Sequence, residues 1–127
     1  MTQTRQSESE ITINVAGAHA ANTLMMWSSA GQNYIVATAA TSNGKLIIGH
    51  LVKATQAAGK AVVRMLSAPG TAIGIASGAI NEGDLVTAAA AGAVAAAGAG
   101  VVLGVALETV TTGESIEYRP WTRANSA

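Results

Sequence analysis

The residues best suited to acid–base chemistry or metal binding are two histidines and a few carboxylates, spread over a chain of 127 residues. His19 and His50 are the only histidines, and no acidic residues cluster beside either of them. A metal or catalytic site requires several such groups to converge, so we expect a surface or packing role for both. The chain has no cysteine, which excludes a thiolate nucleophile, a disulfide framework and a zinc knuckle.

Asp84 and Glu114 are a second candidate pair, because paired carboxylates can serve as general acid and base. Each acid directly follows a glycine, Gly83 or Gly113, and the two acids occupy equivalent positions of an internal repeat. Their equivalent positions after a glycine indicate that both acids are turn residues. We therefore assign neither acid to catalysis.

Two lysines that follow glycines suggest phosphate binding, but the surrounding sequence does not fit. A P-loop needs Ser or Thr after the lysine and a further glycine five residues earlier, and Gly44-Lys45 and Gly59-Lys60 lack both. Ser42 and Lys45 match the spacing of a β-lactamase fragment, yet they lie on a predicted turn rather than on a helix. We predict that the protein is not an enzyme and that it has no catalytic residue, no metal and no cofactor.

The elements that position these residues are organised by a repeat. Residues 70–86 and 100–116 align without a gap, with Gly74 over Gly104 and Gly83 over Gly113. Apolar residues match along both units. Each unit is typical of a short strand with a central glycine, a loop, a turn of glycine and acid, and a second strand.

Glycine followed by a charged residue and then by apolar residues recurs four times, and glycine supplies the positive φ that tight turns need. The predicted structural turn residues are Asn43, Gly44, Gly59, Gly83, Asp84, Gly113 and Glu114. Asn43-Gly44 is a strong hairpin signal and predicts a hairpin over residues 34–52. These markers predict an antiparallel β meander. The expected fold class is therefore all-β, a small antiparallel β-barrel or β-sandwich built from hairpins.

The chain length indicates one domain. We predict an extended N-terminal arm over residues 1–32 with one strand at 11–15, a β-barrel domain over residues 33–119, and a C-terminal tail over residues 120–127. Residues 88–100 are rich in alanine, which alone favours a helix. Three glycines interrupt this segment, so we favour a turn between two short strands, with a single helical turn as the alternative.

The composition predicts a thin core. The chain has no Phe and is rich in Ala and Gly, whereas the burial of Leu or Val is what contributes roughly 1.5 to 3 kcal/mol per residue. The isolated protomer should be marginally stable, so we predict an oligomer or a large partner. The formal net charge is zero and the basic residues are scattered, which excludes the usual electrostatic footprint for nucleic acid.

One segment imitates a membrane span. Residues 85–107 carry no charge, and Gly100 and Gly104 have the spacing of a helix-pairing motif. Against this, Ala and Gly insert weakly, no basic cluster flanks the segment, and the repeat places half of it in strands. We predict no membrane contact, and a membrane-associated Ala/Gly-rich protein is the alternative.

Five residues are candidates for contact with a partner. Ile11, Ile13 and Val15 alternate with polar residues, which predicts a strand with one buried face. Such a strand can be the first strand of its own sheet, or it can add to the sheet of a neighbour. Trp27 and Trp121 have the amphipathic character that is enriched at interfaces, and the alternative is that they plug the open end of the barrel.

From residue 79 onward, the sequence resembles the small capsid decoration, or cement, proteins of tailed bacteriophages. The segments that carry the resemblance are Ala79-Ile80-Asn81-Glu82-Gly83-Asp84-Leu85-Val86, Leu103-Gly104-Val105-Ala106-Leu107-Glu108 and Thr112-Gly113-Glu114. These segments cover roughly the last third to half of the chain. The region before Tyr34 matches no motif of that family.

The resemblance implies a barrel-like or tulip-like all-β domain that forms a homotrimer. It further implies a virion protein on the outer capsid surface, assembled in the host cytoplasm, that binds between subunits of the major capsid protein and lays its N-terminal arm along the capsid. The alternative from another class is a carbohydrate- or host-recognition domain of a phage tail or surface.

Overall fold

The computed structural model describes residues 10–28, 31, 33–36, 46–66, 70–96 and 100–120. Within these residues it contains strands and one short 3₁₀ turn, η2 (Ala90–Gly92). The strands are β1 (Glu10–Val15), β2 (Leu24–Ser28), β3 (Asn33–Val36), β4 (Ile47–Leu51), β5 (Gly59–Met65), β6 (Ala72–Ile75), β7 (Leu85–Ala88), β8 (Val94–Ala96), β9 (Val102–Ala106) and β10 (Ser115–Pro120). The all-β fold class predicted from the sequence is confirmed.

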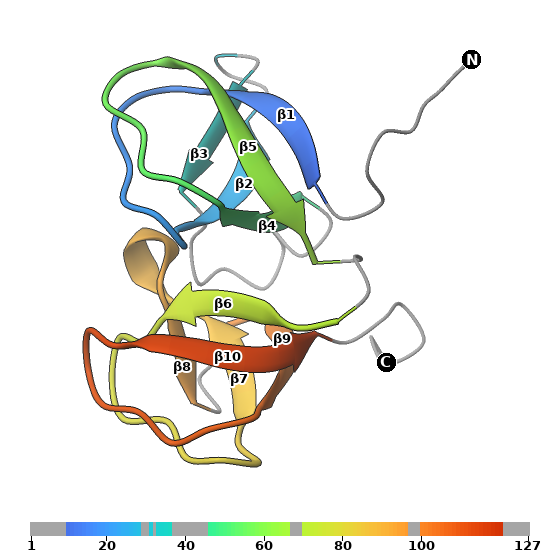
Figure 1. The fold of residues 1–127 in the computed structure, drawn as a ribbon, viewed down its shortest axis with the longest axis vertical. Helices are drawn as coiled ribbons and strands as arrows, with labels where there is room; N and C mark the ends of the chain where they lie inside the picture. Colours follow the sequence, from blue (N-terminus) through green and yellow to red (C-terminus); the bar gives the residue numbers. More distant parts are fainter. Residues whose placement is uncertain are drawn as a thin grey trace.

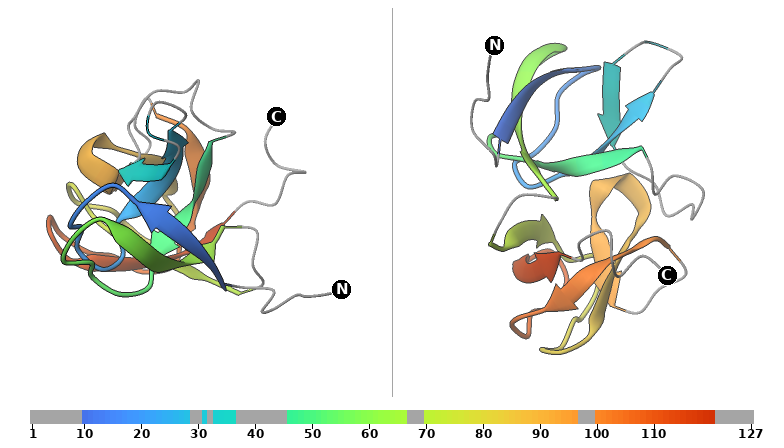
Figure 2. Two further views of the ribbon diagram at one scale, coloured as in Figure 1. Left: turned by 90° about the horizontal axis from the view of Figure 1, so that it is seen from above. Right: turned by 90° about the vertical axis from the view of Figure 1, so that its right-hand side faces the viewer.

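Strands β1 to β5 form a closed barrel with the order β1-β3-β2-β4-β5, which we call the first barrel. Strands β6 to β10 form a second sheet with the order β6-β10-β9-β7-β8. The first barrel and the second sheet are stacked along the longest axis of the molecule (Figures 1 and 2).

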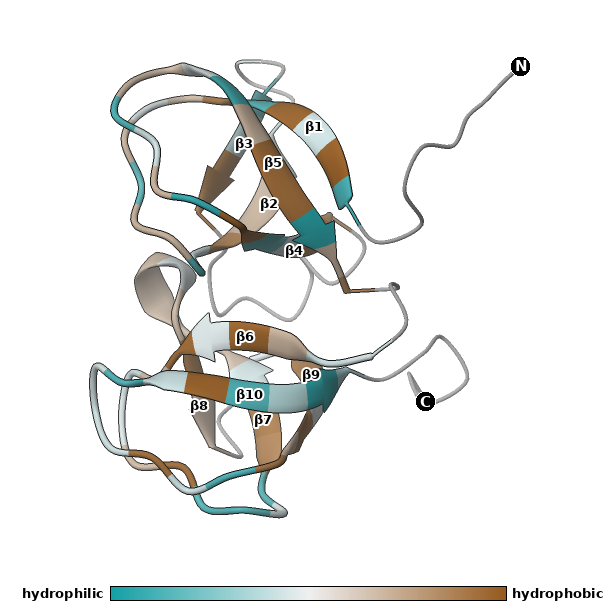
Figure 3. Ribbon diagram, viewed as in Figure 1, coloured by the Kyte–Doolittle hydropathy of each residue, from teal (hydrophilic) through white to brown (hydrophobic). Residues whose placement is uncertain are grey.

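Alternation of side chains determines which face of each strand is buried. In β1, Ile13 and Val15 are buried whereas Thr12 and Asn14 are exposed, because successive side chains of a strand point to opposite faces. The same alternation holds in β10, where Ile116 and Tyr118 are buried and Ser115, Glu117 and Arg119 are exposed. Bands of different hydropathy follow one another along β10 (Figure 3). The buried residues of the first barrel form one cluster, which comprises Ile13, Val15, Met25, Leu51, Ala61 and Val63.

Both strands of the first repeat unit pair with strands of the second unit. The first strand of unit one, β6, pairs antiparallel with the second strand of unit two, β10, and β7 pairs in the same way with β9. Between these pairs, Ile80 and Val110 exchange two backbone hydrogen bonds of 3.1 and 2.9 Å. The predicted meander is therefore wrong. The Gly83–Asp84 turn does not close a hairpin, because β6 and β7 do not pair with each other. The strands on either side of the Gly113–Glu114 turn, β9 and β10, do pair antiparallel.

The first barrel and the second sheet share one topology, which we had not predicted. In each half, the first strand pairs antiparallel with the fifth, the fifth with the fourth, the fourth with the second, and the second with the third. In each half the first strand also meets the third in parallel, at Val15 and Tyr34 in the barrel and at Ala76 and Val94 in the second sheet.

Local contacts repeat with the topology. The antiparallel bridge between His19 and Thr55 corresponds to the bridge between Ile80 and Val110. Gly49 lies against the backbone of Arg64 in the first barrel, and Gly104 lies in the same way against Arg119 in the second sheet. The chain therefore consists of two tandem copies of one five-strand unit. The shorter repeat found in the sequence, residues 70–86 and 100–116, lies within the second copy.

The interior of the second sheet is completed by the outer face of the first barrel. Leu24 and Met26 of β2 pack into the hydrophobic cluster that contains Val86, Ile116 and Tyr118, whereas the intervening Met25 points into the barrel. Because β2 alternates, one strand supplies both cores.

The predicted domain boundaries differ from these units. Strands β1 and β2 lie within residues 1–32 but pair with β5, β3 and β4, so they are integral to the first barrel rather than part of an arm. Residues 1–9 and 121–127 lie outside the described residues. The predicted hairpin over residues 34–52 is wrong, because β2 lies between β3 and β4; its turn residues Asn43 and Gly44 lie outside the described residues.

Residues 88–96 contain both structures that we had considered. β7 pairs antiparallel with β8, and the connection between them includes the 3₁₀ turn η2. Ala91 and Gly92 both have positive φ there, at 59° and 77°. The described part of residues 85–107 thus consists of strands and this turn. In the part of the chain that the structure describes, no helix is long and apolar enough to cross a membrane.

Candidate partner-binding site

A groove of about 270 Å³ runs along β1 where this strand approaches β3, and we call it the β1 groove. Its lining comes from β1, from the paired strands β2 and β3, and from the start of β5. The lining residues are Ile11, Thr12, Ile13, Asn14, Trp27, Asn33, Tyr34 and Lys60.

The groove follows from incomplete pairing of β1. On one side, β1 pairs with β5 over six residues, from Glu10 with Arg64 to Val15 with Gly59. On the other side, its pairing with β3 is confined to Val15 and Tyr34, followed by a 3.1 Å hydrogen bond from the Ala16 amide to the Tyr34 carbonyl. Among the described residues, the edge of β1 that precedes Val15 therefore borders the groove and pairs with no strand. Such an edge is a template for pairing with another chain.

Two aromatic residues form the opposite wall. Trp27 and Tyr34 are directly opposite each other in the antiparallel pair of β2 and β3, and their ring centroids are 5.3 Å apart with an interplanar angle of 66°. Edge-to-face aromatic pairs of this kind add about 0.5 to 1.5 kcal/mol beyond area burial. Both side chains are only partly buried, so part of each residue is accessible beside the groove.

The rim of the groove is polar. Thr12, Asn14 and Lys60 are exposed, and Asn14 is the cross-strand neighbour of Lys60. Asn33 precedes Tyr34 and is partly buried. An apolar floor with a polar rim is the usual anatomy of a protein interface.

The predicted contact residues divide into three groups. Ile11, Ile13 and Trp27, which are remote in the sequence, meet at the β1 groove. Val15 lies below it, 2% exposed, in the core of the first barrel. Trp121 lies outside the described residues. Of the two alternatives for residues 11–15, the structure shows a strand within the sheet of its own chain. Contact of these residues with a partner stays a prediction.

The predicted turn residues occupy strained or capped positions where the structure describes them. Gly83 and Gly113 have φ values of 90° and 85°, which favour glycine. The Asp84 carboxylate accepts a 2.9 Å hydrogen bond from the Asn81 amide. The Glu114 carboxylate accepts the equivalent 2.8 Å bond from the Thr111 amide.

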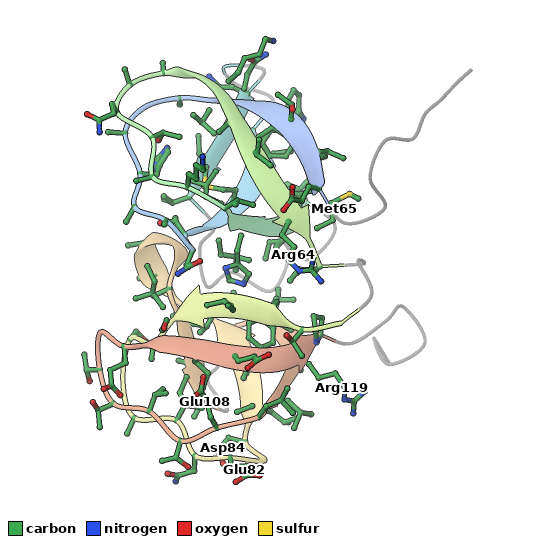
Figure 4. The ribbon with its side chains drawn as sticks, viewed as in Figure 1. Arg64, Met65, Glu82, Asp84, Glu108 and Arg119 are labelled. Carbon is green, nitrogen blue, oxygen red and sulfur yellow. The ribbon has the colours of Figure 1, made fainter. Side chains whose placement is uncertain are left out.

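Asp84 and Glu114 thus cap the turns that contain them. Glu82, Asp84 and Glu108 lie at the end of the second sheet that is remote from the first barrel (Figure 4). Gly59, with a φ of 148°, begins β5 near the groove. Among the described residues, no group of three or more His, Cys, Asp or Glu side chains could hold a metal ion.

Sequence reasoning missed the role of Tyr34 and Asn33 and the contact made by His50. A signal for the former was available, since polar and small residues between Trp27 and Tyr34 separate two apolar runs and predict a hairpin that would pair these rings. No comparable signal predicts the environment of His50, which is 3% exposed between the first barrel and the second sheet.

Burial lowers the pKa of His50 to about 4, although the hydrogen bond to the Asn22 carbonyl acts in the opposite direction. Burial also raises the pKa of Tyr118 above its usual range. The imidazole and the phenol are thus both neutral at physiological pH. They form a packing and hydrogen-bonding contact rather than an acid–base pair.

The chain is an all-β protein in which two five-stranded units of one topology are arranged in tandem. No protein-family model matches the sequence, and no curated protein matches it. Among solved structures, the chain is similar to the N base of the head fiber gp8.5 in bacteriophage phi29, with a TM-score of 0.69 and 19% sequence identity. The match covers 88% of this chain and 92% of that chain. The likeness shows a shared fold that includes both halves.

Proposed function

We propose that the chain is a structural protein of a phage virion, without enzymatic activity, that decorates the outer surface of the capsid as a homotrimer. The observation that carries this proposal is the fold shared with the N base of a phage head fiber over 88% of the chain. The resemblance to phage cement proteins from residue 79 onward supports the same location independently. We infer that its partner is the major capsid protein.

The mechanism is additive. A standard protein interface buries about 1,600 Å². Repetition of such a contact over a shell raises the energy that is needed to separate neighbouring capsid subunits, because each bound copy links more than one of them. Rigid all-β units suit this task, since a partner surface that is already ordered loses little conformational entropy on binding.

Bare heads, purified from the encoding phage with this gene deleted, provide the test. We expect the purified protein to sediment with the heads, to saturate at a fixed number of copies per head, and to raise the temperature at which the heads open. Failure of the protein to sediment with heads, while it remains folded by circular dichroism, would contradict capsid binding.

The contribution of the N-terminus is tested by a truncation that ends before β1. Removal of residues 1–9 leaves all six pairs between β1 and β5 in place, whereas removal of residues 1–16 would delete a barrel strand. If the N-terminal arm lies along the capsid, the shorter truncation weakens sedimentation with heads and leaves thermal unfolding unchanged. Unchanged capsid binding would remove the arm from the proposal.

Glycan binding is a second candidate function, favoured by the partly exposed Trp27 and Tyr34 beside Asn33 and Asn14 in one groove. Aromatic faces with a few polar groups can orient a sugar ring. Quenching or shift of Trp27 fluorescence on titration with host-surface polysaccharide, in a Trp121→Phe variant, would support this function. Absence of any fluorescence change up to millimolar glycan would exclude it.

A further inference from the structure

The backbone of β1 uses one of its two edges to pair with β5. The carbonyl of Val62 in β5 accepts a 3.0 Å hydrogen bond from the residue that follows β4, so it points away from β1. Because the backbone groups of successive residues in a strand point to opposite sides, those of Ala61 and Val63 point towards β1. Their partners in the register are Ile13 and Ile11. The backbone groups of Ile11 and Ile13 are therefore directed to β5.

The other edge of β1 carries the backbone groups of Thr12 and Asn14. The Ala16 amide points to β3, where it donates to the Tyr34 carbonyl. The amides two and four residues earlier point to the same side. The pairing of β3 with β1 is confined to Val15 and Tyr34, so none of the described strands pairs with Thr12 on this side. The amide and carbonyl of Thr12 and the amide of Asn14 thus face the β1 groove.

The floor of the groove belongs to the core of the first barrel. Ile13 is 6% exposed, and Tyr34 packs against the same buried cluster. The barrel is therefore closed beneath the groove, and an occupant would lie on its outside. Above this floor, Ile11 and Trp27 are partly buried and Thr12 is exposed. The accessible part of the groove is a strand edge with apolar side chains beside it.

An extended peptide segment matches these features. A strand laid beside β1 can pair its own amides and carbonyls with those of Thr12 and Asn14, at the spacing that a ladder requires. Its side chains would alternate between the two faces of the sheet. Those on the inner face would contact Ile11 and Trp27, and those on the outer face would lie beside the exposed side chains of Thr12 and Asn14. The matching segment therefore alternates apolar and polar residues.

The charge at the rim favours an acidic segment. Lys60 is exposed and is the cross-strand neighbour of Asn14. Among the lining residues that the structure describes, Lys60 alone carries a charge. A carboxylate on the outer face of an added strand would complement this charge. An exposed ion pair of this kind contributes more to orientation and specificity than to affinity.

We propose that the edge of β1 is the capsid-binding site and that it binds an extended segment of the major capsid protein as an added strand. The segment packs apolar residues against Ile11 and Trp27 and directs an acidic residue to Lys60. This inference rests on the proposed function, because it names the site and the partner segment of that function. The proposed N-terminal arm leads directly into β1 at Glu10, so an arm that lies along the capsid would bring this edge to the same surface.

Replacement of Thr12 by proline tests the backbone pairing. It removes an amide that faces the groove and no donor to β5, and proline is tolerated at an edge position of this kind. In sedimentation with bare heads, we expect Thr12→Pro to raise the concentration for half-saturation by at least about tenfold, since pairing loses at least one hydrogen bond and meets the proline ring. Thr12→Val keeps the amide and the size of the side chain. This control should bind within about twofold of the natural chain.

Replacement of Lys60 by Glu tests the same surface without a change in the backbone, and it decides the question if Thr12→Pro does not fold. At low ionic strength, we expect Lys60→Glu to raise the concentration for half-saturation by about threefold or more. Lys53→Glu makes the same change of charge at an exposed lysine outside the groove. This matched control should bind heads as the natural chain does.

Overlapping synthetic peptides of the major capsid protein identify the segment. The fluorescence of Trp27, in a Trp121→Phe variant, reports their binding beside β1. We expect a response to one segment that alternates apolar and polar residues and contains an acidic residue. Addition of Thr12→Pro should abolish this response. A peptide in which lysine replaces the acidic residue should bind the Lys60→Glu variant more tightly than the unchanged peptide does.

The outcomes separate this inference from the proposed function. If folded Thr12→Pro, or Lys60→Glu compared with Lys53→Glu, binds heads as well as the natural chain, the strand edge is not the site and capsid binding stands. A natural chain that does not bind heads would contradict the proposed function and this inference together. Absence of a Trp27 response to any capsid peptide at millimolar concentration would exclude an extended segment as the occupant. A response to host polysaccharide alone would assign the groove to a glycan and overturn the inference.

Discussion

The Nε2 atom of His50 lies 2.5 Å from the hydroxyl oxygen of Tyr118, so that a side chain of the first barrel reaches the interior of the second sheet. The Nδ1 atom of the same ring lies 2.9 Å from the carbonyl oxygen of Asn22. Because a carbonyl can only accept a hydrogen bond, Nδ1 carries the proton and Nε2 accepts from the Tyr118 hydroxyl. The two rings also form an edge-to-face contact with centroids 5.6 Å apart. This pair is a specific link between the two halves.

Replacement of Tyr118 by Phe is expected to destabilise the protein by about 1 to 3 kcal/mol, since it leaves the buried Nε2 of His50 without a donor. The shape of the ring is kept, so packing is little changed. Urea unfolding followed by circular dichroism measures the effect. Tyr34→Phe, at a partly exposed tyrosine, is the control and should stay within about 0.5 kcal/mol. Equal effects at the two positions would mean that the His50 contact does not stabilise the fold.

Stability should fall as the pH is lowered through the range in which His50 is protonated only in the unfolded chain. The folded pKa of His50 is about 4, below the ordinary 6.5, so the unfolded state binds more protons between these values. The contribution of the neutral imidazole is complete above pH 6.5 and is lost progressively down to about pH 4, by about 3 kcal/mol in total.

Urea unfolding at a series of pH values checks this dependence. A His50→Gln variant should lose this part of the pH dependence while it keeps the contribution of every other group. If the natural chain and the variant have parallel stability profiles between pH 4 and 7, the low pKa of His50 is wrong.

Replacement of Gly74 by Ala should destabilise the contact between the halves by about 1 to 3 kcal/mol, because the new methyl group would lie 2.9 Å from the His50 ring. Gly78→Ala is a matched control, since a Cβ there would meet nothing within 4 Å. Thermal unfolding of both variants measures the difference. A stable Gly74→Ala variant with an unperturbed His50 NMR signal would show that the halves are not packed as described.

The tandem topology predicts equal sensitivity at Gly49 and Gly104. An added Cβ would lie 2.0 Å from the Arg64 carbonyl oxygen in the first case and 2.1 Å from the Arg119 carbonyl oxygen in the second. Since a backbone atom cannot move aside cheaply, each Ala variant should lose about 3 kcal/mol or more. Expression level and urea unfolding report this loss. A variant at either position that matched the natural chain in stability would contradict the equivalence of the two units.

The sequence predicted those features that depend on neighbouring residues. Alternation of Ile13 and Val15 with polar residues predicts a strand with one buried face, and this is the pattern of β1. Gly83 and Gly113 precede strands at equivalent places, because the positive φ at each is a local requirement that glycine meets at no steric cost. Three of the predicted contact residues, Ile11, Ile13 and Trp27, also proved to line one groove.

Strand order was decided by the tertiary structure, because pairing depends on contacts between segments that are distant in sequence. The Asn43-Gly44 signal predicts a hairpin, but β2 separates β3 from β4. The tandem unit stayed hidden because equivalent residues, such as Val15 with Ala76 and Gly49 with Gly104, are offset by different numbers of residues. A sequence comparison without gaps therefore finds only the shorter repeat of residues 70–86 and 100–116.

The sequence by itself determined the all-β class, the turn glycines and the buried face of β1, since propensity, φ and alternation act over a few residues. Only the tertiary structure decided that Gly74 makes room for His50 and that Trp27 and Ile13 line one groove. Those contacts join segments that no local rule relates. The contact between Gly74 and His50 exists because the outer face of the first barrel completes the interior of the second sheet.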